Sequence, residues 1–405
     1  MSSVLSHAEI PLSTEVNDRE IPVTPVSVVP RSELAKLPIW KSAFASLRKD
    51  RRYYEIVEDT ICPDFRYSYF AIHDRDGAPR SIQPFFVLDQ DLLVGLGSRA
   101  LKIAHVIRKL WPRFLVMRSL MVGCAAGEAH LQATGEPARR RDAELLSADI
   151  VRLAKEQKAS LVVLKEFPSQ YRRALSCFLS RGFSRIPSMP MTRLNIAYEN
   201  FDDYMAKALT GNTRKQLRKK FRVTEQAGPI ELEIVADASH AVDEIYPLYL
   251  QVFEKSNFHF EKLSKAYFRE IGQRMPDKAR FFLWRQNGKL IAFALCLMEG
   301  ETLYGEYLGL DYSMALRIHL YFYMMRDIIG WAIENGFTSI VSSSLGYAPK
   351  LHMRHVLEPL DVYVRHTSPL INAVMKRVLP WLEPTRAEKT LKEFPNYDAL
   401  WAKPG

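Results

Sequence analysis

The chain has 405 residues, more than one ordinary hydrophobic core accommodates, so we expect two domains. Its 47% hydrophobic and 25% charged residues are typical of a globular protein, and no apolar run reaches the roughly 18–20 residues that span a bilayer. The net charge of +10 indicates anionic partners, whereas four widely separated cysteines argue against a disulfide framework or a zinc site.

The first 35 residues carry several prolines without helical periodicity, which predicts a flexible tail. They also lack the basic and apolar regions of a secretory leader, so we expect a cytoplasmic protein. Residues 36–198 predict a first domain. Its expected elements are strands at 66–74, 81–89 and 114–123, a helix at 143–159, a strand at 161–167 and a helix at 171–179.

Residues 199–368 predict a second domain with a similar order of elements. They are a basic helix near 212–222, a helix at 244–256, three strands within 279–311, a helix at 318–335 and a strand at 338–344. The segments 148–167 and 326–345 each place a helix before a buried strand, which indicates a repeat. The predicted fold class is therefore α/β (an α+β mixed sheet), with two such sheets in tandem.

Two amphipathic segments carry basic residues beside an apolar stripe. One is 101–115, and the other opens the C-terminal extension 369–405. Both patterns are typical of helices that lie at a lipid surface, and equally of helices that pack on a domain core. Together with the basic charge they favour an anionic membrane surface as a partner, which would place the protein on the cytoplasmic face of an inner membrane.

Three segments resemble tandem GNAT-type acyltransferases, and more narrowly the FemAB-like branch described as peptidoglycan biosynthesis/recognition. They are NTRKQLRKKFR at 212–222, YGEYLGLD at 304–311, and the helix with its following loop at 318–359. The last is similar to a family pattern of His on the long helix, followed by the positions that Gly346, Lys350, Arg354 and Pro359 occupy here. The resemblance implies two tandem GNAT-like domains and an N-acyltransferase activity.

The expected donor site departs from that of ordinary acetyltransferases. Their glycine-containing phosphate loop is absent before the helix at 318, where DYSMALR stands at 311–317. In the first domain GCAAGEAH (123–130) follows a buried strand, and the N–H groups of such a loop bind phosphate. We therefore predict that Gly123, Gly127 and His130 bind an acyl-CoA or acyl carrier protein (ACP) thioester. We expect no tightly bound cofactor and no metal.

Acyl transfer to an amine needs a proton acceptor, donors for the oxyanion, and aligned substrates. Glu306 lies in the middle of a predicted strand, and strand alternation places Tyr304 on the same face. We predict catalytic roles for Glu306, Tyr304, His319 and Lys350. The alternatives are a solvent-facing Glu306 and a His319 whose ring is satisfied in the core.

Polar residues are dense after the last buried strand of the second domain, where loops form clefts. We predict that Tyr347, His352, Arg354 and Arg317 bind substrate, because these side chains suit carboxylate or phosphate groups. Solvated loop charges would explain some of the same pattern.

The sequence therefore predicts an N-acyltransferase that moves an acyl group from a CoA or ACP thioester to an amine, including a lipid or sphingoid-type amine. The basic run 214–222 has Phe221 as its one aromatic residue, so we expect no specific nucleic acid partner. Two alternatives remain open. One is a FemAB-like transferase that uses aminoacyl-tRNA on a peptidoglycan precursor; the other is a non-catalytic scaffold in envelope lipid or polysaccharide synthesis.

Overall fold

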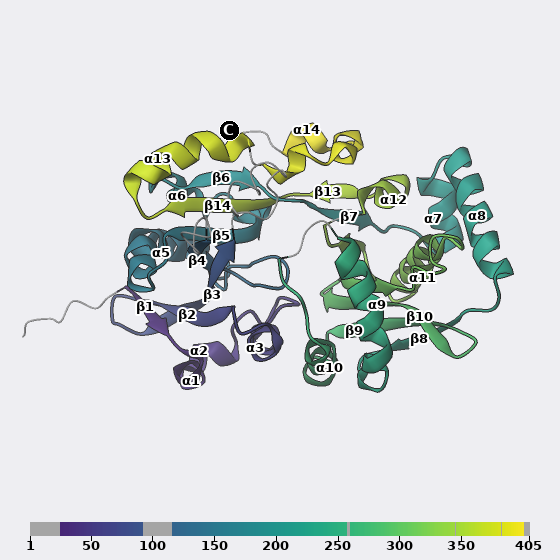
Figure 1. Ribbon diagram of the computed structural model, residues 1–405, viewed down its shortest axis with the longest axis horizontal. Coiled ribbons are helices and arrows are strands. Elements are labelled where there is room, and N and C mark those ends of the chain that lie inside the picture. Colours follow the sequence, from purple (N-terminus) through teal and green to yellow (C-terminus); the bar gives the residue numbers. More distant parts are fainter. Residues whose placement is uncertain (1–24, 92–115, 257–259, 345, 382, 401–405) are drawn as a thin grey trace, which may run out of the picture.

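The computed structural model describes residues 25–91, 116–256, 260–344, 346–381 and 383–400. In these ranges the chain forms two seven-stranded sheets flanked by helices (Figure 1). The predicted α/β fold class, with two mixed sheets in tandem, is confirmed. None of the helices in the described ranges is long and apolar enough to cross a membrane.

The first sheet has the strand order β1-β2-β3-β4-β5-β14-β6. Its strands are β1 (Val26–Val29), β2 (Arg66–His73), β3 (Pro79–Asp91), β4 (Val116–Val122), β5 (Leu161–Pro168), β6 (Ser184–Pro187) and β14 (Leu360–His366). The helices of this half are α1 (Arg31–Leu34), α2 (Pro38–Lys41), α3 (Arg51–Thr60), α5 (Glu136–Glu156) and α6 (Ser176–Ser180). The predicted helix at 171–179 is therefore mostly a turn, with α6 as its short helical end.

The second sheet has the strand order β13-β7-β12-β11-β10-β9-β8. Its strands are β7 (Met191–Asn195), β8 (Glu231–Val235), β9 (Ala279–Gln286), β10 (Lys289–Glu299), β11 (Thr302–Leu310), β12 (Ser339–Ser342) and β13 (Val356–Glu358). The helices are α7 (Phe201–Ala208), α8 (Gly211–Gln226), α9 (Val242–Lys255), α10 (Lys265–Arg274), α11 (Leu320–Glu334) and α12 (Tyr347–His352). After the last strand come α13 (Pro369–Val378), short 3-10 turns and α14 (Tyr397–Leu400).

Each sheet receives one strand from the other half of the sequence. β7 pairs with β12 and β13 in the second sheet, and β14 pairs with β5 and β6 in the first. The predicted domain boundaries after residues 198 and 368 therefore each follow a strand that has crossed to the other sheet. Neither strand is among the elements predicted above, and the sheet edge with which a strand pairs depends on distant residues.

The predicted tail through residue 35 is wrong for the segment that forms β1 and α1. β1 pairs with β2, Val26 is fully buried, and Leu34 of α1 lies in the core. The four residues of β1 are too few to show a period, so their pairing with a sheet edge is a tertiary effect. The amphipathic segment predicted at 101–115 lies outside the described residues.

Local signals explain several element boundaries. α3 begins after Asp50, whose carboxylate accepts a hydrogen bond from the Arg52 N–H at 2.9 Å. The β9–β10 hairpin turns at Asn287 and Gly288, which both have positive φ, as the Asn-Gly pair predicts.

The two halves share one hydrophobic core. It joins Tyr53 of α3 and Phe86 of β3 to Phe268 of α10 and Phe293 of β10, and α3 packs against α10 at this junction (Figure 1). The opposite face of the second sheet has a separate core, which α8 and α11 cover. Because an extensive apolar junction resists relative motion, we expect the two halves to behave as one rigid unit.

A candidate site at the junction of the two halves

Two consecutive cations enter the domain junction from the loop between α2 and α3. Arg48 and Lys49 are 1% and 0% exposed. Arg48 Nε donates to Glu306 Oε1 at 2.6 Å, and the Arg48 guanidinium also donates to Glu128 and lies 3.6 Å from the centre of the Tyr304 ring. Arg48 therefore links a carboxylate of the first half to a carboxylate of the second. We call Arg48, Lys49, Glu128, His130 and Glu306 the junction cluster.

Lys49 fills the loop that we predicted to hold a donor phosphate. Its Nζ lies 2.7 Å from Glu128 Oε2 and 3.5 Å from the carbonyl oxygens of Ala126 and Glu128. Gly127 has φ of +79°, which favours glycine, and a Cβ there would come within 2.3 Å of that Nζ and displace it. The loop at 123–130 thus surrounds a cation with oxygen atoms. This geometry does not support the predicted phosphate-binding role of Gly123 and Gly127.

His130 continues the junction cluster into the first domain. Its Nε2 is 3.0 Å from Glu128 Oε1, and its Nδ1 is 3.2 Å from the Tyr171 hydroxyl. Burial alone would raise the pKa of Glu128, but Arg48 and Lys49 outweigh it and hold that pKa well below its ordinary value. Glu128 is therefore a fixed anion that orients its partners, and it is unsuited to accept a proton near neutral pH.

Glu306 occupies a β-bulge in β11. The register with β10 shifts between Leu295 and Cys296, which pair with Tyr307 and Gly305, so Glu306 is the extra residue. Glu306 and Tyr304 both contact Arg48, in agreement with the prediction that they share a face. Glu306 is 9% exposed and also lies 3.7 Å from Lys49 Nζ, so two cations neutralise its charge.

A second polar group at the junction surrounds Glu261. The Tyr307 hydroxyl donates to Glu261 Oε1 at 3.1 Å, and Lys165 Nζ donates to Glu166 Oε2 at 2.7 Å and to the Gly127 carbonyl at 3.0 Å. Glu261 is partly accessible to solvent. Burial raises the pKa of Glu261 above 4.5; Lys165 opposes this shift, and Glu166 adds to it. A partly accessible carboxyl with a raised pKa is suited to proton transfer.

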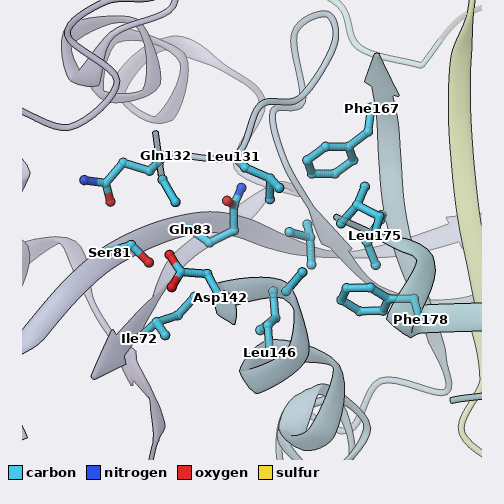
Figure 2. Close-up of a pocket in the computed structure, with 14 residues that line it drawn as sticks. Ile72, Ser81, Gln83, Leu131, Gln132, Asp142, Leu146, Phe167, Leu175 and Phe178 are labelled. Carbon is cyan, nitrogen blue, oxygen red and sulfur yellow. The ribbon is translucent and has the colours of Figure 1, made fainter. Parts of the chain in front are cut away.

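Two other carboxyl groups in the described residues also have raised pKa values because of burial, Asp142 and Asp327. Asp327 accepts hydrogen bonds from Trp284 and Arg326 and lies under the second sheet. Asp142 points from α5 into a cavity inside the first domain (Figure 2). Because that cavity measures about 10 Å³, it has room for about one water molecule and none for a substrate. Among the described carboxyl groups whose pKa is raised by burial, Glu261 is thus the one that lies at the junction of the two halves.

The structure places His319 and Arg317 away from the junction. α11 begins at Leu320, so His319 precedes the helix, with φ of 57°, whereas we predicted it on the helix. Burial and the nearby Lys220 and Lys219 lower the pKa of His319. Arg317 is exposed and precedes Ile318, whose carbonyl accepts a hydrogen bond from Thr224 of α8. In the described part of the chain, neither residue has a hydrogen bond or ion pair with Glu306 or Glu261.

The remaining predicted residues lie on or just after α12. The Tyr347 hydroxyl donates to the Pro190 carbonyl at 2.7 Å within a small core, whereas His352 and Arg354 are exposed. Lys350 is buried, and its Nζ donates to the Ser343 carbonyl at 2.6 Å. The structure therefore brings Glu306 and Tyr304 together, and it places the α12 residues in a separate region.

Lys350 makes stability depend on pH. Burial lowers the pKa of Lys350 from 10.5 to about 7, so the unfolded chain binds this proton more tightly than the folded protein. The buried lysine therefore lowers the free energy of unfolding by its full amount below about pH 7, and this destabilisation decreases as the pH rises toward 10.5. We expect the Tm of Lys350→Met, relative to wild type, to be highest near pH 7 and to fall toward pH 10.5. Thermal unfolding at both pH values measures this difference. A relative Tm that is constant with pH, as we expect for the exposed Lys389→Met control, would contradict the assignment.

Sequence reasoning missed Arg48, Lys49, Glu128 and Glu261. Arg48 and Lys49 belong to the charged run RKDRR at 48–52, which has the appearance of a solvated surface. Glu128 lies inside the loop that we singled out, where the glycines drew attention instead. Glu261 is one acidic residue in a connection between helices, and no local pattern distinguishes it.

Comparisons with known proteins agree with this architecture. A family model named FemAB-like, with the description peptidoglycan biosynthesis/recognition, matches residues 108–352, more than half of the chain. A curated relative, "Putative 8-amino-7-oxononanoate synthase 2" of Mycobacterium tuberculosis, is 22% identical over 84% of this chain. The chain spans 45% of the length of that relative.

Two solved structures are similar to this chain at low sequence identity. The crystal structure of FemX has a TM-score of 0.50 and 12% identity, and the match covers 83% of this chain and 96% of FemX. A tandem GNAT protein from the clavulanic acid biosynthesis pathway has a TM-score of 0.45 and 11% identity, with 85% of this chain and 99% of that protein covered.

Proposed function

The chain belongs to the FemAB-like family, and we propose that it is an N-acyltransferase whose site lies at the domain junction. The fold of this family supports transfer of acyl or aminoacyl groups. The observation that carries the proposal is Glu261. It combines partial solvent access with a raised pKa, and it accepts a hydrogen bond from Tyr307 at the meeting of the two halves. The neighbouring carboxylates Glu128 and Glu306 form ion pairs with Arg48 and Lys49, so we assign them a structural role in the site.

The proposed reaction begins with an acceptor amine in its ammonium form. The Glu261 carboxylate takes one proton from it, and the free amine attacks the carbonyl carbon of the acyl donor. The new C–N bond forms, and the bond from that carbon to the carrier sulfur or oxygen breaks. The second amine proton goes to the departing thiolate or alkoxide. Lys165 is the nearby cation suited to stabilise the negative charge that develops on the carbonyl oxygen.

The cationic face of α8 supports a donor on an anionic carrier. Six basic residues occur on this helix, and in the described part of the chain none of them forms an ion pair: Arg214, Lys215, Arg218, Lys219, Lys220 and Arg222. α8 packs on the face of the second sheet opposite the shared core, so a small thioester bound at the junction would not reach it. A carrier that uses both regions is therefore a macromolecule, either an acidic ACP or a tRNA.

The tRNA alternative has one specific observation in its favour. Lys220 lies 3.4 Å from the ring centre of Phe322, so the α8 face joins its cations to an aromatic ring, as single-stranded nucleic-acid sites do. The thioester proposal and the aminoacyl-tRNA alternative therefore differ in the carrier and share the junction chemistry. The acceptor in either case is an amine, including a lipid amine.

The test presents acyl-CoA, acyl-ACP and aminoacyl-tRNA separately to the full chain with an amine acceptor, and detects the amide product by mass spectrometry. Product from a thioester supports the proposal. Product from aminoacyl-tRNA that is lost after RNase treatment would establish the alternative. The double variant Lys215→Glu/Arg218→Glu serves as the carrier control, because it should weaken transfer from ACP or tRNA and leave transfer from CoA unchanged. Absence of product from every donor would favour a scaffold.

A further inference from the structure

Helix α13 exposes its apolar face, whereas a helix that packs on a core buries it. Its side chains Leu370, Ile371, Val374 and Val378 are 82%, 52%, 62% and 45% exposed. Positions i, i+1, i+4 and i+8 lie on one helix face, so these side chains form a continuous apolar stripe. No described segment of the chain covers it. Figure 1 shows α13 along the outer edge of the first sheet, beside β6 and β14.

A polar anchor holds α13 to the protein. Asn372, the one buried residue of the helix, accepts a hydrogen bond from the His366 N–H at 2.9 Å and donates to the Gly182 carbonyl at 3.0 Å. Met375 packs against the shared core from the same inner side. Because these contacts fix the orientation of the helix, the outward position of the apolar stripe is determined by the fold.

Basic residues lie on α13 and beside its anchor. Lys376 and Arg377 lie on α13, and Arg365 of β14 donates a hydrogen bond to the Arg181 carbonyl next to the anchor. Neither these three cations nor the side chain of Arg181 forms an ion pair within the described part of the chain. An exposed apolar stripe on a helix that also carries cations is the arrangement that binds the interface of an anionic bilayer.

We propose that α13 docks the protein on an anionic lipid bilayer. The apolar stripe enters the boundary between headgroups and acyl chains, and Lys376, Arg377, Arg365 and Arg181 bind lipid phosphates. A second copy of the chain is a poorer occupant, because symmetric pairing of two such faces would bring the same cations together. The proposal is independent of the transfer reaction, since vesicle binding requires no turnover, and it would bring the enzyme to lipid-borne amines.

The test is co-sedimentation of the full chain with phosphatidylcholine vesicles, with and without phosphatidylglycerol. We expect binding to the anionic vesicles and about tenfold weaker binding for Ile371→Ser/Val374→Ser and for Lys376→Glu/Arg377→Glu. Both pairs are on the surface, and circular dichroism checks that the fold is retained. Leu316→Ser is the matched control, because Leu316 is 70% exposed on the second domain and should not affect binding.

Three outcomes would overturn the proposal. The first is wild-type binding by both α13 variants. The second is loss of binding in Leu316→Ser alone, which would move the docking surface to the α8 side. The third is a wild-type chain that does not bind anionic vesicles and sediments as a dimer, while the α13 variants sediment as monomers. That result would make the stripe an interface between copies.

Discussion

Replacing Arg48 by alanine is expected to lower the free energy of unfolding by about 3–5 kcal/mol, because it leaves buried carboxylates without their main partner. Arg48 is 1% exposed and contacts Glu128 and Glu306 at once. Lys49 remains, but its Nζ is 3.7 Å from Glu306. Urea unfolding followed by circular dichroism measures the change. Among alanine substitutions in the α2–α3 loop, Arg48→Ala should lower the free energy of unfolding most.

The control for Arg48 is the neighbouring Arg51. Arg51 also pairs with a carboxylate, Glu55, at 3.1 Å, but its side chain is 37% exposed, so Arg51→Ala should cost about 0–1 kcal/mol. If unpaired buried charge is the cause, adding Glu306→Gln to Arg48→Ala should recover about 1–3 kcal/mol. Equal losses for Arg48→Ala and Arg51→Ala would show that the junction cluster does not hold the two halves together.

Replacing Glu261 by glutamine is expected to lower kcat/KM for amide formation by about 10²–10⁴-fold, because the amide cannot accept the ammonium proton. Glutamine has nearly the same shape and can still accept the hydrogen bond from Tyr307, so the fold should be retained. The measurement is steady-state transfer with the donor that supports turnover.

Glu254→Gln is the matched control for this second prediction. Glu254 is an exposed residue of α9, close to Glu261 in the chain, and it forms no ion pair in the described residues. Its replacement should leave kcat/KM within about twofold of wild type. Similar small effects for Glu254→Gln and Glu261→Gln would remove Glu261 from the reaction, whatever the donor.

The sequence was sufficient to predict the elements that depend on local pattern. The helix and strand of the repeat at 148–167 and 326–345 became α5–β5 and α11–β12, and β5 and β12 each pair in parallel with the preceding strand, β4 or β11. The Asn287–Gly288 hairpin also formed where predicted. These features follow from hydrophobic period and turn chemistry, which adjacent residues determine.

Features that depend on distant pairing could not be predicted in this way. The crossing of β7 and β14 depends on which sheet edge is open, and β1 depends on β2 as its partner. The residues of the site also divide into those set by local pattern and those set by distant contacts. Glu306 and Tyr304 were found from strand alternation, but Arg48 and Lys49 are buried only because carboxylates from both halves surround them. Glu261 depends on Tyr307 and Lys165, which are remote in sequence.

The most direct test of the central claim, that Glu261 accepts the proton at the domain junction, is the pH dependence of kcat/KM for wild type, Tyr307→Phe and Glu261→Gln. A base acts when deprotonated, so the wild-type rate should rise with pH through the raised pKa of Glu261 and then level off. The Tyr307 hydrogen bond lowers the pKa of Glu261, so Tyr307→Phe should move this limb to higher pH. Glu261→Gln should abolish it. An unchanged acidic limb in Glu261→Gln would contradict the account.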